Sequence, residues 1–461
     1  MRLSFTDLFN KNKKIFLLGF LLLSATLAVY AGILGNNFLN FWDDHEYVLF
    51  NESAKGFTLQ HLKTAFTGFF VGNYAPMHIV SYMLDYSLWG MNPAGYFFGN
   101  ILLHASSGLL LYSIMLRLRY PPMLAFVAAY IFLFHPVQVE SVAWISQRKN
   151  VLAMFFFLIA LQRYMIYREE PARRATNYLL SVSSLSLALL SKSVTVIFPV
   201  VALLYDLSFE KGDNRRVRIA DKIPYVVVAA VIAFLALTSQ AEQLGGGRRD
   251  YPGGSIVSML YTMLPVLASY LKDVFLPIGL GPYYIIAIKT EPDMTFILSL
   301  ALLLFLIILG IVLFFKNRRL CFFYCLFFIG LLPVFQIVPL ITLKNDRYLY
   351  FPLLGLAGFC AEIISLLKHA FPQRQKPLIL LVIVLLLPLP VLSFRQASIW
   401  KDDLTLWNYV VRKDPENLLG WLQLSRIYTL KRNDQAANEA AEHYELLVKK
   451  YGSLRGWEND K

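Results

Sequence analysis

Residues 15–47 read IFLLGFLLLSATLAVYAGILGNNFLNFWDDHEY, an apolar segment followed at once by an acidic one. The apolar part, Ile15–Leu34, has the length of about 20 residues that a helix needs to cross a membrane. The acidic part, residues 41–47 (FWDDHEY), therefore lies close to a membrane surface. Three carboxylates and an imidazole at that place either form a solvated face or meet a reacting group at the edge of the bilayer.

The composition is that of a membrane protein. Of the 461 residues, 57% are hydrophobic and 16% are charged, whereas soluble domains carry about a quarter charged residues. Recurring apolar segments predict an all-α polytopic protein with about eleven spans. The segments are Ile15–Leu34, Tyr96–Leu116, Leu124–Phe134, Val151–Ile166, Leu179–Leu190, Val194–Tyr205, Tyr225–Leu237, Phe296–Phe315, Cys321–Leu340, Leu349–Leu367 and Leu378–Leu392. A further segment, Ile256–Leu276, contains Pro265, Lys272 and Asp273 and is followed by Pro277, so we expect it at the outer face rather than across the membrane.

The net charge of +13 does not indicate nucleic-acid binding, because the basic residues sit in short loops between the predicted spans. Such loops, for example Lys211–Lys222 and Lys316–Arg319, fall on one side of the membrane, as the positive-inside rule describes. This pattern predicts a cytoplasmic N-terminus. It places residues 41–47, the glycine-rich loop Gly245–Gly254 and the polar tail after residue 394 on the outer side.

Two outer regions have helical patterns of their own. In the first outer loop, residues 36–93, apolar residues recur at helical spacing in Thr58–Phe66 and in Met77–Leu88. We expect these two segments to be interfacial helices on the outer leaflet. In the tail, residues 395–461, amphipathic spacing covers Trp400–Tyr428 and about Ala436–Lys450, and it is similar to one tetratricopeptide repeat.

Titratable side chains gather at the predicted outer ends of the spans. They are Asp43, Asp44, Glu46, Asp85, Glu140, Arg148, Lys192, Asp346 and Arg347, together with His78 and His135. Charges at a membrane are costly and need an explanation. Adjacent carboxylates suit a general base, whereas lysine and arginine suit a phosphate. Together they indicate transfer from a phosphate leaving group to an acceptor hydroxyl.

These residues also have ordinary structural explanations. Asp43 and Asp44 are explained equally well as solvated loop acids, and Lys192 as a lysine that extends to the headgroups. Arg347 is explained as a topological anchor, and His135 as the end of a helix before proline. A divalent metal at Asp43, Asp44 and His45 is a further alternative, although three consecutive side chains do not easily face one ion.

Several motifs in a fixed order resemble one family. They are Phe41-Trp-Asp-Asp44, Tyr74-Ala-Pro-Met77, Asn100-Ile-Leu-Leu-His104, His135-Pro-Val-Gln-Val-Glu140-Ser-Val-Ala, Leu190-Ser-Lys192, Asp346-Arg347-Tyr348-Leu-Tyr-Phe-Pro352 and the repeat-like tail. Nearly the whole chain resembles bacterial relatives of the transmembrane and tetratricopeptide-repeat O-mannosyltransferases. These are GT-C glycosyltransferases that use a polyprenyl-phosphate sugar.

The resemblance implies a GT-C transmembrane domain over residues 1–394 and a helical tail over 395–461. It implies that Asp43 or Asp44 deprotonates the acceptor, and that Lys192, His135 and Arg347 hold the lipid phosphate. We expect Arg148 to join the phosphate site from the same outer face. The expected supporting residues are Glu140, His78, Tyr74, Glu46, Asp346 and Tyr348.

The expected reaction is inverting transfer of a mannose-like hexose from polyprenyl phosphate to a hydroxyl of a protein or of a cell-envelope glycan or lipid. The expected site is the outer face of a bacterial plasma membrane. Once the phosphate is neutralised it leaves readily, so the chemistry requires no metal. A non-catalytic scaffold that docks partners through the tail is the alternative. A lipid-sugar transporter is disfavoured, because it would place ionisable residues near the middle of the bilayer.

Overall fold

The computed structural model describes residues 5–209, 219–243 and 250–451, and the loops Lys211–Lys222 and Gly245–Gly254 lie partly outside these ranges. The described residues form helices, with one isolated bridge between Phe70 and Asn73 as their only extended pairing. The all-α class expected from the sequence is therefore confirmed for this part of the chain.

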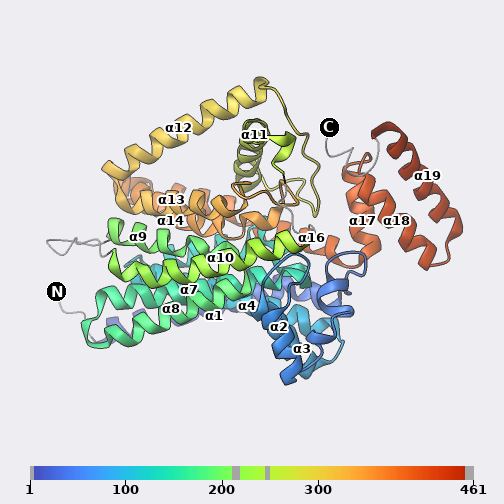
Figure 1. The fold of residues 1–461 in the computed structure, drawn as a ribbon. Helices are drawn as coiled ribbons and strands as arrows, with labels where there is room; N and C mark the ends of the chain where they lie inside the picture. The colour runs from blue at the N-terminus through green and yellow to red at the C-terminus, as the bar shows by residue number, and fades with distance from the viewer. Residues whose placement is uncertain (1–4, 210–218, 244–249, 452–461) are drawn as a thin grey trace.

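Most helices lie side by side in one elongated bundle (Figure 1). The bundle consists of α1 (Phe5–Tyr30), α4 (Pro93–Arg117), α5 (Pro122–Phe134), α7 (Arg148–Glu169), α8 (Arg174–Ser191), α9 (Phe198–Phe209), α10 (Ile223–Gln243), α13 (Arg318–Leu331), α14 (Pro352–Ala370), α15 (Gln375–Leu386) and α16 (Pro388–Ala397). Short α6 (Val139–Ala143) follows α5, and α11 (Ile256–Phe275) and α12 (Met294–Lys316) lie along one side. Proline at the first turn of α4, α5 and α14 favours helix starts at these positions.

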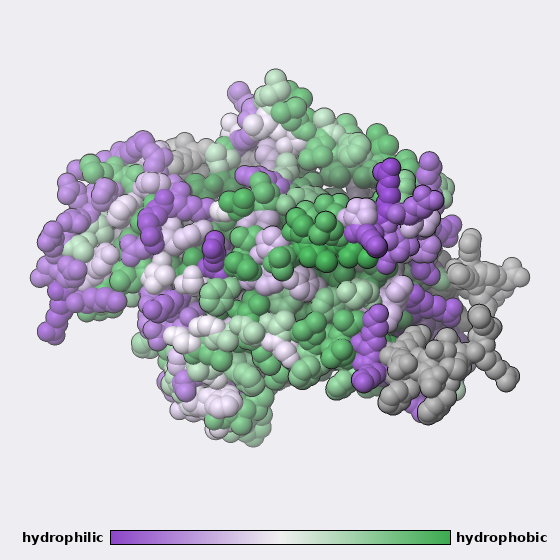
Figure 2. Space-filling view, turned by 180° about the vertical axis from the view of Figure 1, so that it is seen from behind, coloured by the Kyte–Doolittle hydropathy of each residue, from purple (hydrophilic) through white to green (hydrophobic). Residues whose placement is uncertain are grey.

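Seven helices in the described residues are long and apolar enough to cross a membrane, or eight if the bent pair α5–α6 counts as one span. The chain is therefore an integral membrane protein, and a hydrophobic belt between two hydrophilic ends is visible on its surface (Figure 2). The seven match seven of the predicted spans. The other four correspond to α5, α8, α9 and α13, so the count of eleven stays a prediction. Helix α11 is not among the seven.

Close contact between bundle helices depends on small residues. A Cβ atom added to Gly355 in α14 would lie 2.3 Å from the backbone nitrogen of Phe327 in α13. One added to Gly108 in α4 would lie 2.5 Å from the Leu133 side chain in α5. Glycine therefore allows these backbones to approach, as is common where membrane helices pack.

The two regions predicted to lie outside the membrane are found at the same end of the bundle (Figure 1). The first outer loop forms α2 (Leu59–Thr67) and α3 (Pro76–Trp89), which confirms both predicted helices. The tail forms α17 (Asp403–Lys413), α18 (Leu418–Leu430) and α19 (Asp434–Tyr451), of which α19 matches the second predicted tail helix. That the tail is a tetratricopeptide repeat stays a prediction.

A buried ionic network holds the opposite end of the bundle. Lys222 binds Asp221 at 2.7 Å and also binds Asp206, while Arg168 binds Asp221 at 3.0 Å. The Tyr164 hydroxyl donates a hydrogen bond to Asp206 at 2.8 Å. Two basic and two acidic side chains thus balance one another, as buried charges must.

We predict that Gly355→Ala lowers the melting temperature of the purified protein in detergent. The new methyl group would meet backbone atoms of α13, and overpacking of this kind costs about 1–3 kcal/mol. The matched control is Gly19→Ala, since a Cβ there would lie at an ordinary 3.8 Å from Leu109. A thermal unfolding scan that shows equal melting temperatures for the two variants would contradict the packing argument.

Candidate active site

The two adjacent acids of the loop between α1 and α2 have different surroundings. Asp44 is fully buried, and its carboxylate accepts hydrogen bonds from the backbone nitrogens of Leu39 at 3.0 Å and Ser146 at 2.9 Å. It also accepts one from the Ser146 hydroxyl. Burial raises the pKa of Asp44 to about 6, although these hydrogen bonds oppose the increase. Asp44 therefore joins the loop to the segment before α7.

Asp43 is half-buried, and no hydrogen bond joins its carboxylate to another residue of the described chain. Its charge acts on Tyr47, Lys149 and Arg347, which places the carboxylate within electrostatic range of two cations. A partly exposed carboxylate without a fixed donor is free to accept a proton from a ligand. Among the two loop acids, only Asp43 has this freedom.

Three basic side chains converge near Asp43. Lys149 at the start of α7 is buried, and its ammonium lies 4.7 Å from the ring centre of Tyr47 and 3.2 Å from the Tyr47 hydroxyl. Lys192 follows α8 and donates a hydrogen bond to Asn150. Burial and the charges of Lys149 and Arg347 lower the pKa of Lys192. We call Lys149, Lys192 and Arg347 the cation cluster.

The charges of this cluster are not balanced. Arg347 forms an ion pair with buried Glu140, and its backbone nitrogen donates to the same carboxylate at 2.8 Å. Neither Lys149 nor Lys192 has an ion-pair partner in the described residues, and Asp43 is the nearby carboxylate left without a pair. Buried ammonium groups are costly unless an anion compensates them. The arrangement therefore fits an anionic ligand beside Asp43.

Arg148 does not join the cation cluster, contrary to the expectation from the sequence. Its guanidinium forms an ion pair with Asp85 at 2.7 Å and donates hydrogen bonds to Asn100 and to the backbone oxygen of Tyr96. It lies 5.6 Å from the ring centre of Tyr82. These contacts join α3, α4 and α7, so Arg148 holds these helices together.

The supporting residues divide into those inside the cluster and those that fix neighbouring segments. Glu140 is part of the cluster through its ion pair with Arg347. His78 lies next to the cluster, with the centre of its ring 4.8 Å from that of Tyr47. Burial lowers the pKa of His78, which keeps its imidazole neutral. His135 fixes a neighbouring segment, because its Nε2 hydrogen-bonds the backbone oxygen of Val274 at 2.8 Å.

The remaining expected residues have surroundings of their own. The Tyr74 hydroxyl donates to the backbone oxygen of Phe66 at 3.0 Å, and Glu46 is exposed. Asp346 accepts from the Gly281 nitrogen at 2.9 Å and from the Tyr284 hydroxyl at 2.6 Å. Burial raises the pKa of Asp346 to about 8. The Tyr348 hydroxyl hydrogen-bonds the Thr342 hydroxyl at 2.7 Å.

Three residues of the site were not expected from the sequence: Tyr47, Lys149 and Asn150. Lys149 and Asn150 stand next to Arg148 at the predicted start of a span, which was the available signal. Adjacent helical residues point about 100° apart, so the three consecutive polar residues reach different partners.

The metal alternative does not fit the geometry of residues 43–45. The Asp44 oxygens face Leu39 and Ser146, and the His45 ring packs against Phe50 with ring centres 4.2 Å apart. The described residues contain no group of three histidine, cysteine, aspartate or glutamate side chains placed to hold one ion.

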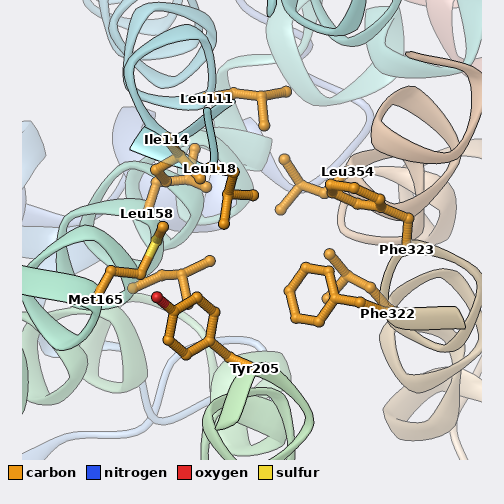
Figure 3. Close-up of a pocket in the computed structure, with 11 residues that line it drawn as sticks. Leu111, Ile114, Leu118, Leu158, Met165, Tyr205, Phe322, Phe323 and Leu354 are labelled. Atoms are coloured by element: carbon orange, nitrogen blue, oxygen red, sulfur yellow. The ribbon is translucent and has the colours of Figure 1, made fainter. Parts of the chain in front are cut away.

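A separate small cavity lies in the bundle (Figure 3). It is lined by Leu111, Ile114, Leu118, Leu158, Leu161, Met165, Tyr205, Phe322, Phe323, Leu326 and Leu354. Its one hydroxyl, that of Tyr205, binds Glu169 at 3.1 Å. Tyr96 marks the cluster end of α4, because its backbone oxygen accepts a hydrogen bond from Arg148, the residue before Lys149. Leu111 is 15 residues farther along α4 from Tyr96, which corresponds to about 22 Å. This apolar cavity lies far from the cation cluster and offers no group for acid–base chemistry.

Comparison with known proteins indicates the class of the chain. Residues 74–239 match a family model described as dolichyl-phosphate-mannose-protein mannosyltransferase. A protein O-mannosyl-transferase of Caenorhabditis elegans is 25% identical over 417 residues, which make up 86% of this chain and 58% of that relative. The protein O-mannosyl-transferase TMTC1 of Mus musculus is 33% identical over 144 residues, or 29% of this chain and 15% of the relative.

A solved structure with a partial likeness is that of ArnT from Cupriavidus metallidurans bound to undecaprenyl phosphate, with a TM-score of 0.41 and 16% identity over 95% of this chain and 76% of that one. The sequence matches confirm the resemblance to membrane O-mannosyltransferases and support a glycosyltransferase. The chain spans 58% of the length of the C. elegans relative.

We predict that the stability difference between wild type and Asp44→Asn depends on pH. The folded pKa of about 6 lies above the ordinary value of 3.8, so the wild type takes up a proton on folding between these values and loses stability as pH rises through them. Asparagine cannot titrate and still offers one acceptor oxygen. The melting temperature of the wild type relative to that of Asp44→Asn should therefore be lower at pH 7.0 than at pH 4.5. Asp43→Asn is the control, and an identical pH slope in all three proteins would contradict the assignment.

Proposed function

We propose that the chain is an inverting glycosyltransferase that moves a mannose-like hexose from polyprenyl phosphate to an acceptor hydroxyl. The observation that carries this proposal is that buried Lys149 and half-buried Lys192 have no anionic partner in the described residues and lie near the unpaired carboxylate of Asp43. The printed names of the relatives, protein O-mannosyl-transferases, support the same reaction. In this proposal the anion that completes the cluster is the phosphate of the donor lipid.

The proposed step uses the groups as they lie. The Asp43 carboxylate accepts the proton of the acceptor hydroxyl, and the hydroxyl oxygen bonds to the anomeric carbon of the sugar. The bond from that carbon to the phosphate oxygen breaks, and its electron pair leaves with the phosphate. Attack from the side opposite the leaving group inverts the anomeric centre. Lys149, Lys192 and Arg347 stabilise the charge that develops on the phosphate, which is the largest catalytic contribution in many enzymes.

The ion pair between Glu140 and Arg347 supports this step. It holds the guanidinium, whose central carbon lies 5.4 Å from the ring of Trp144 and 5.5 Å from that of Tyr348. An arginine restrained in this way loses little conformational freedom when a phosphate binds. Glu140 also neutralises one of the three positive charges of the cluster.

We place the site on the outer face of a bacterial plasma membrane, with the N-terminus in the cytoplasm and the tail outside. The basic loops of the sequence support this orientation. The donor tail would lie in the bilayer, and the acceptor, a protein or a cell-envelope glycan or lipid, would approach from outside. The first outer loop, with α2 and α3, and the tail, with α17 to α19, lie at one end of the bundle (Figure 1), which supports this arrangement.

We predict that Asp43→Asn lowers kcat by about 10²–10⁴-fold, the usual contribution of a general base, and leaves the KM for the donor unchanged. Transfer of label from polyprenyl-phosphate mannose in membranes measures both values. Glu46→Gln is the matched control, because it removes an exposed acid from the same loop. Near-normal turnover by Asp43→Asn would rule out the assigned base, and transfer by no protein with any of several such donors would favour the scaffold alternative.

We predict that Lys192→Gln and Lys149→Gln each lower kcat/KM by about 10- to 100-fold, since a hydrogen bond to a charged group is worth about 1.5–3 kcal/mol. Both variants should also bind the released lipid phosphate more weakly in a direct binding measurement with undecaprenyl phosphate. Lys63→Gln on the exposed face of α2 is the control. Unchanged binding in both cluster variants would show that the lysines do not hold the phosphate.

A further inference from the structure

The C-terminal helices share their hydrophobic core with the loop that carries Asp43. Buried Trp407, Val410, Leu424 and Ile427 of α17 and α18 form the centre of a small cluster, and Phe41 and Trp42 pack against it. The indole rings of Trp42 and Trp407 stack with centres 4.7 Å apart and planes 21° apart. The two residues before Asp43 thus belong to the packing of the tail.

Asp403, at the first turn of α17, fixes the backbone of the same loop. One carboxylate oxygen accepts from the Asn40 nitrogen at 2.9 Å, and the other accepts from the Phe41 nitrogen at 3.1 Å. The Asp403 residue is 8% exposed, so water competes little for these two amides. Hydrogen bonds to a charged acceptor are roughly twice as strong as those between neutral groups.

The start of the loop is fixed by backbone groups that precede α17. The Asn37 nitrogen donates to the Lys401 oxygen at 2.9 Å, and the Asn36 side chain donates to the Trp400 oxygen at 3.0 Å. Asp44 is held by Ser146 on the other side. Asp43 is therefore an unbonded side chain on a backbone that is anchored immediately before and immediately after it.

A second set of contacts leads from α17 to the cation cluster. Trp42 meets Trp144 edge-on, with centres 5.3 Å apart, and the Arg347 guanidinium lies over Trp144. The Tyr409 hydroxyl donates to the backbone oxygen of Leu280. The neighbouring Gly281 nitrogen donates to Asp346, the residue before Arg347. The tail thus contacts residues that neighbour the proposed base, Asp43, and residues that neighbour Arg347, which is proposed to bind the phosphate.

We infer that α17 is a structural part of the active site, in which Asp403 and Trp407 are positioning residues that hold Asp43 in register with the cation cluster. The inference rests on the proposed function for its catalytic consequence, because Asp43 is the proposed base. The structural part of the inference is that residues 36–44 are clamped in place, and it depends only on the hydrogen bonds described above. The tail, which in the scaffold alternative docks partners, then has a role inside the enzyme.

The test compares Asp403→Ala and Asp403→Asn with Asp402→Ala in the full-length protein. Asp402 is the matched control, because it is adjacent and equally charged but caps α17 itself, accepting from the Thr405 nitrogen at 2.8 Å. Hydrogen–deuterium exchange reports the amides of Asn40 and Phe41, and transfer from polyprenyl-phosphate mannose reports kcat and KM.

Asp403→Ala should speed exchange in peptides that cover residues 36–44. It should also lower kcat by about 10- to 100-fold, the scale expected when a reacting group is displaced by about 1 Å, with a donor KM near that of the wild type. Asp403→Asn keeps one acceptor oxygen and should fall between wild type and Asp403→Ala in both measurements. Asp402→Ala should resemble the wild type in the loop and in kcat.

Unchanged exchange in Asp403→Ala would overturn the clamp, and faster exchange with unchanged kcat would overturn the positioning role. Equal losses in Asp402→Ala and Asp403→Ala would also overturn it, because the effect would then come from α17 as a whole. Exchange needs no substrate. If the wild type transfers sugar from no donor, the proposed function fails, while the exchange data still decide whether the clamp exists.

Discussion

A charged side chain that leaves water at the end of the bundle near Asp43 must find a partner of opposite charge, and most of the structure at that end follows from this requirement. Arg148 binds Asp85, Arg347 binds Glu140, and Lys344 binds Asp273 at 2.6 Å. Each pair joins segments that are far apart in the chain, so each fixes the packing of separate helices. Once these pairs have formed, buried Lys149, half-buried Lys192 and the carboxylate of Asp43 remain near one another.

Incomplete neutralisation of buried charges lowers the stability of a protein that binds no ligand. An unpaired buried ammonium lowers stability unless a ligand compensates it, and stored strain of this kind is typical of functional sites. The opposite end of the bundle is the instructive contrast, because Arg168, Lys222, Asp206 and Asp221 neutralise one another there. The same chain can therefore balance its buried charges where no ligand is expected.

The sequence predicts the positions of the helices better than the side-chain pairings between them. Hydropathy locates the long spans, and local periodicity locates α2, α3 and α19, because these signals lie within single segments. Pairings such as Arg148 with Asp85 depend on which helices meet, and local pattern contains no such information. The same limit explains why Asp43 and Asp44 could not be separated: two adjacent acids have the same sequence context, and Ser146, about a hundred residues away, binds only one of them.

The junction of loop and tail shows how two weak units can stabilise each other. Three helices of this size form a small core, and helical repeats, which the tail resembles in sequence, normally need several neighbours to be stable. Here Phe41 and Trp42 cover the apolar face of α17 and α18 as a neighbouring repeat would. The loop in turn obtains from Asp403 the acceptors for two of its amides. Because a coupling free energy is reciprocal, a ligand that orders the loop around Asp43 must also stabilise α17, and a partner that moves α17 must also change the position of Asp43.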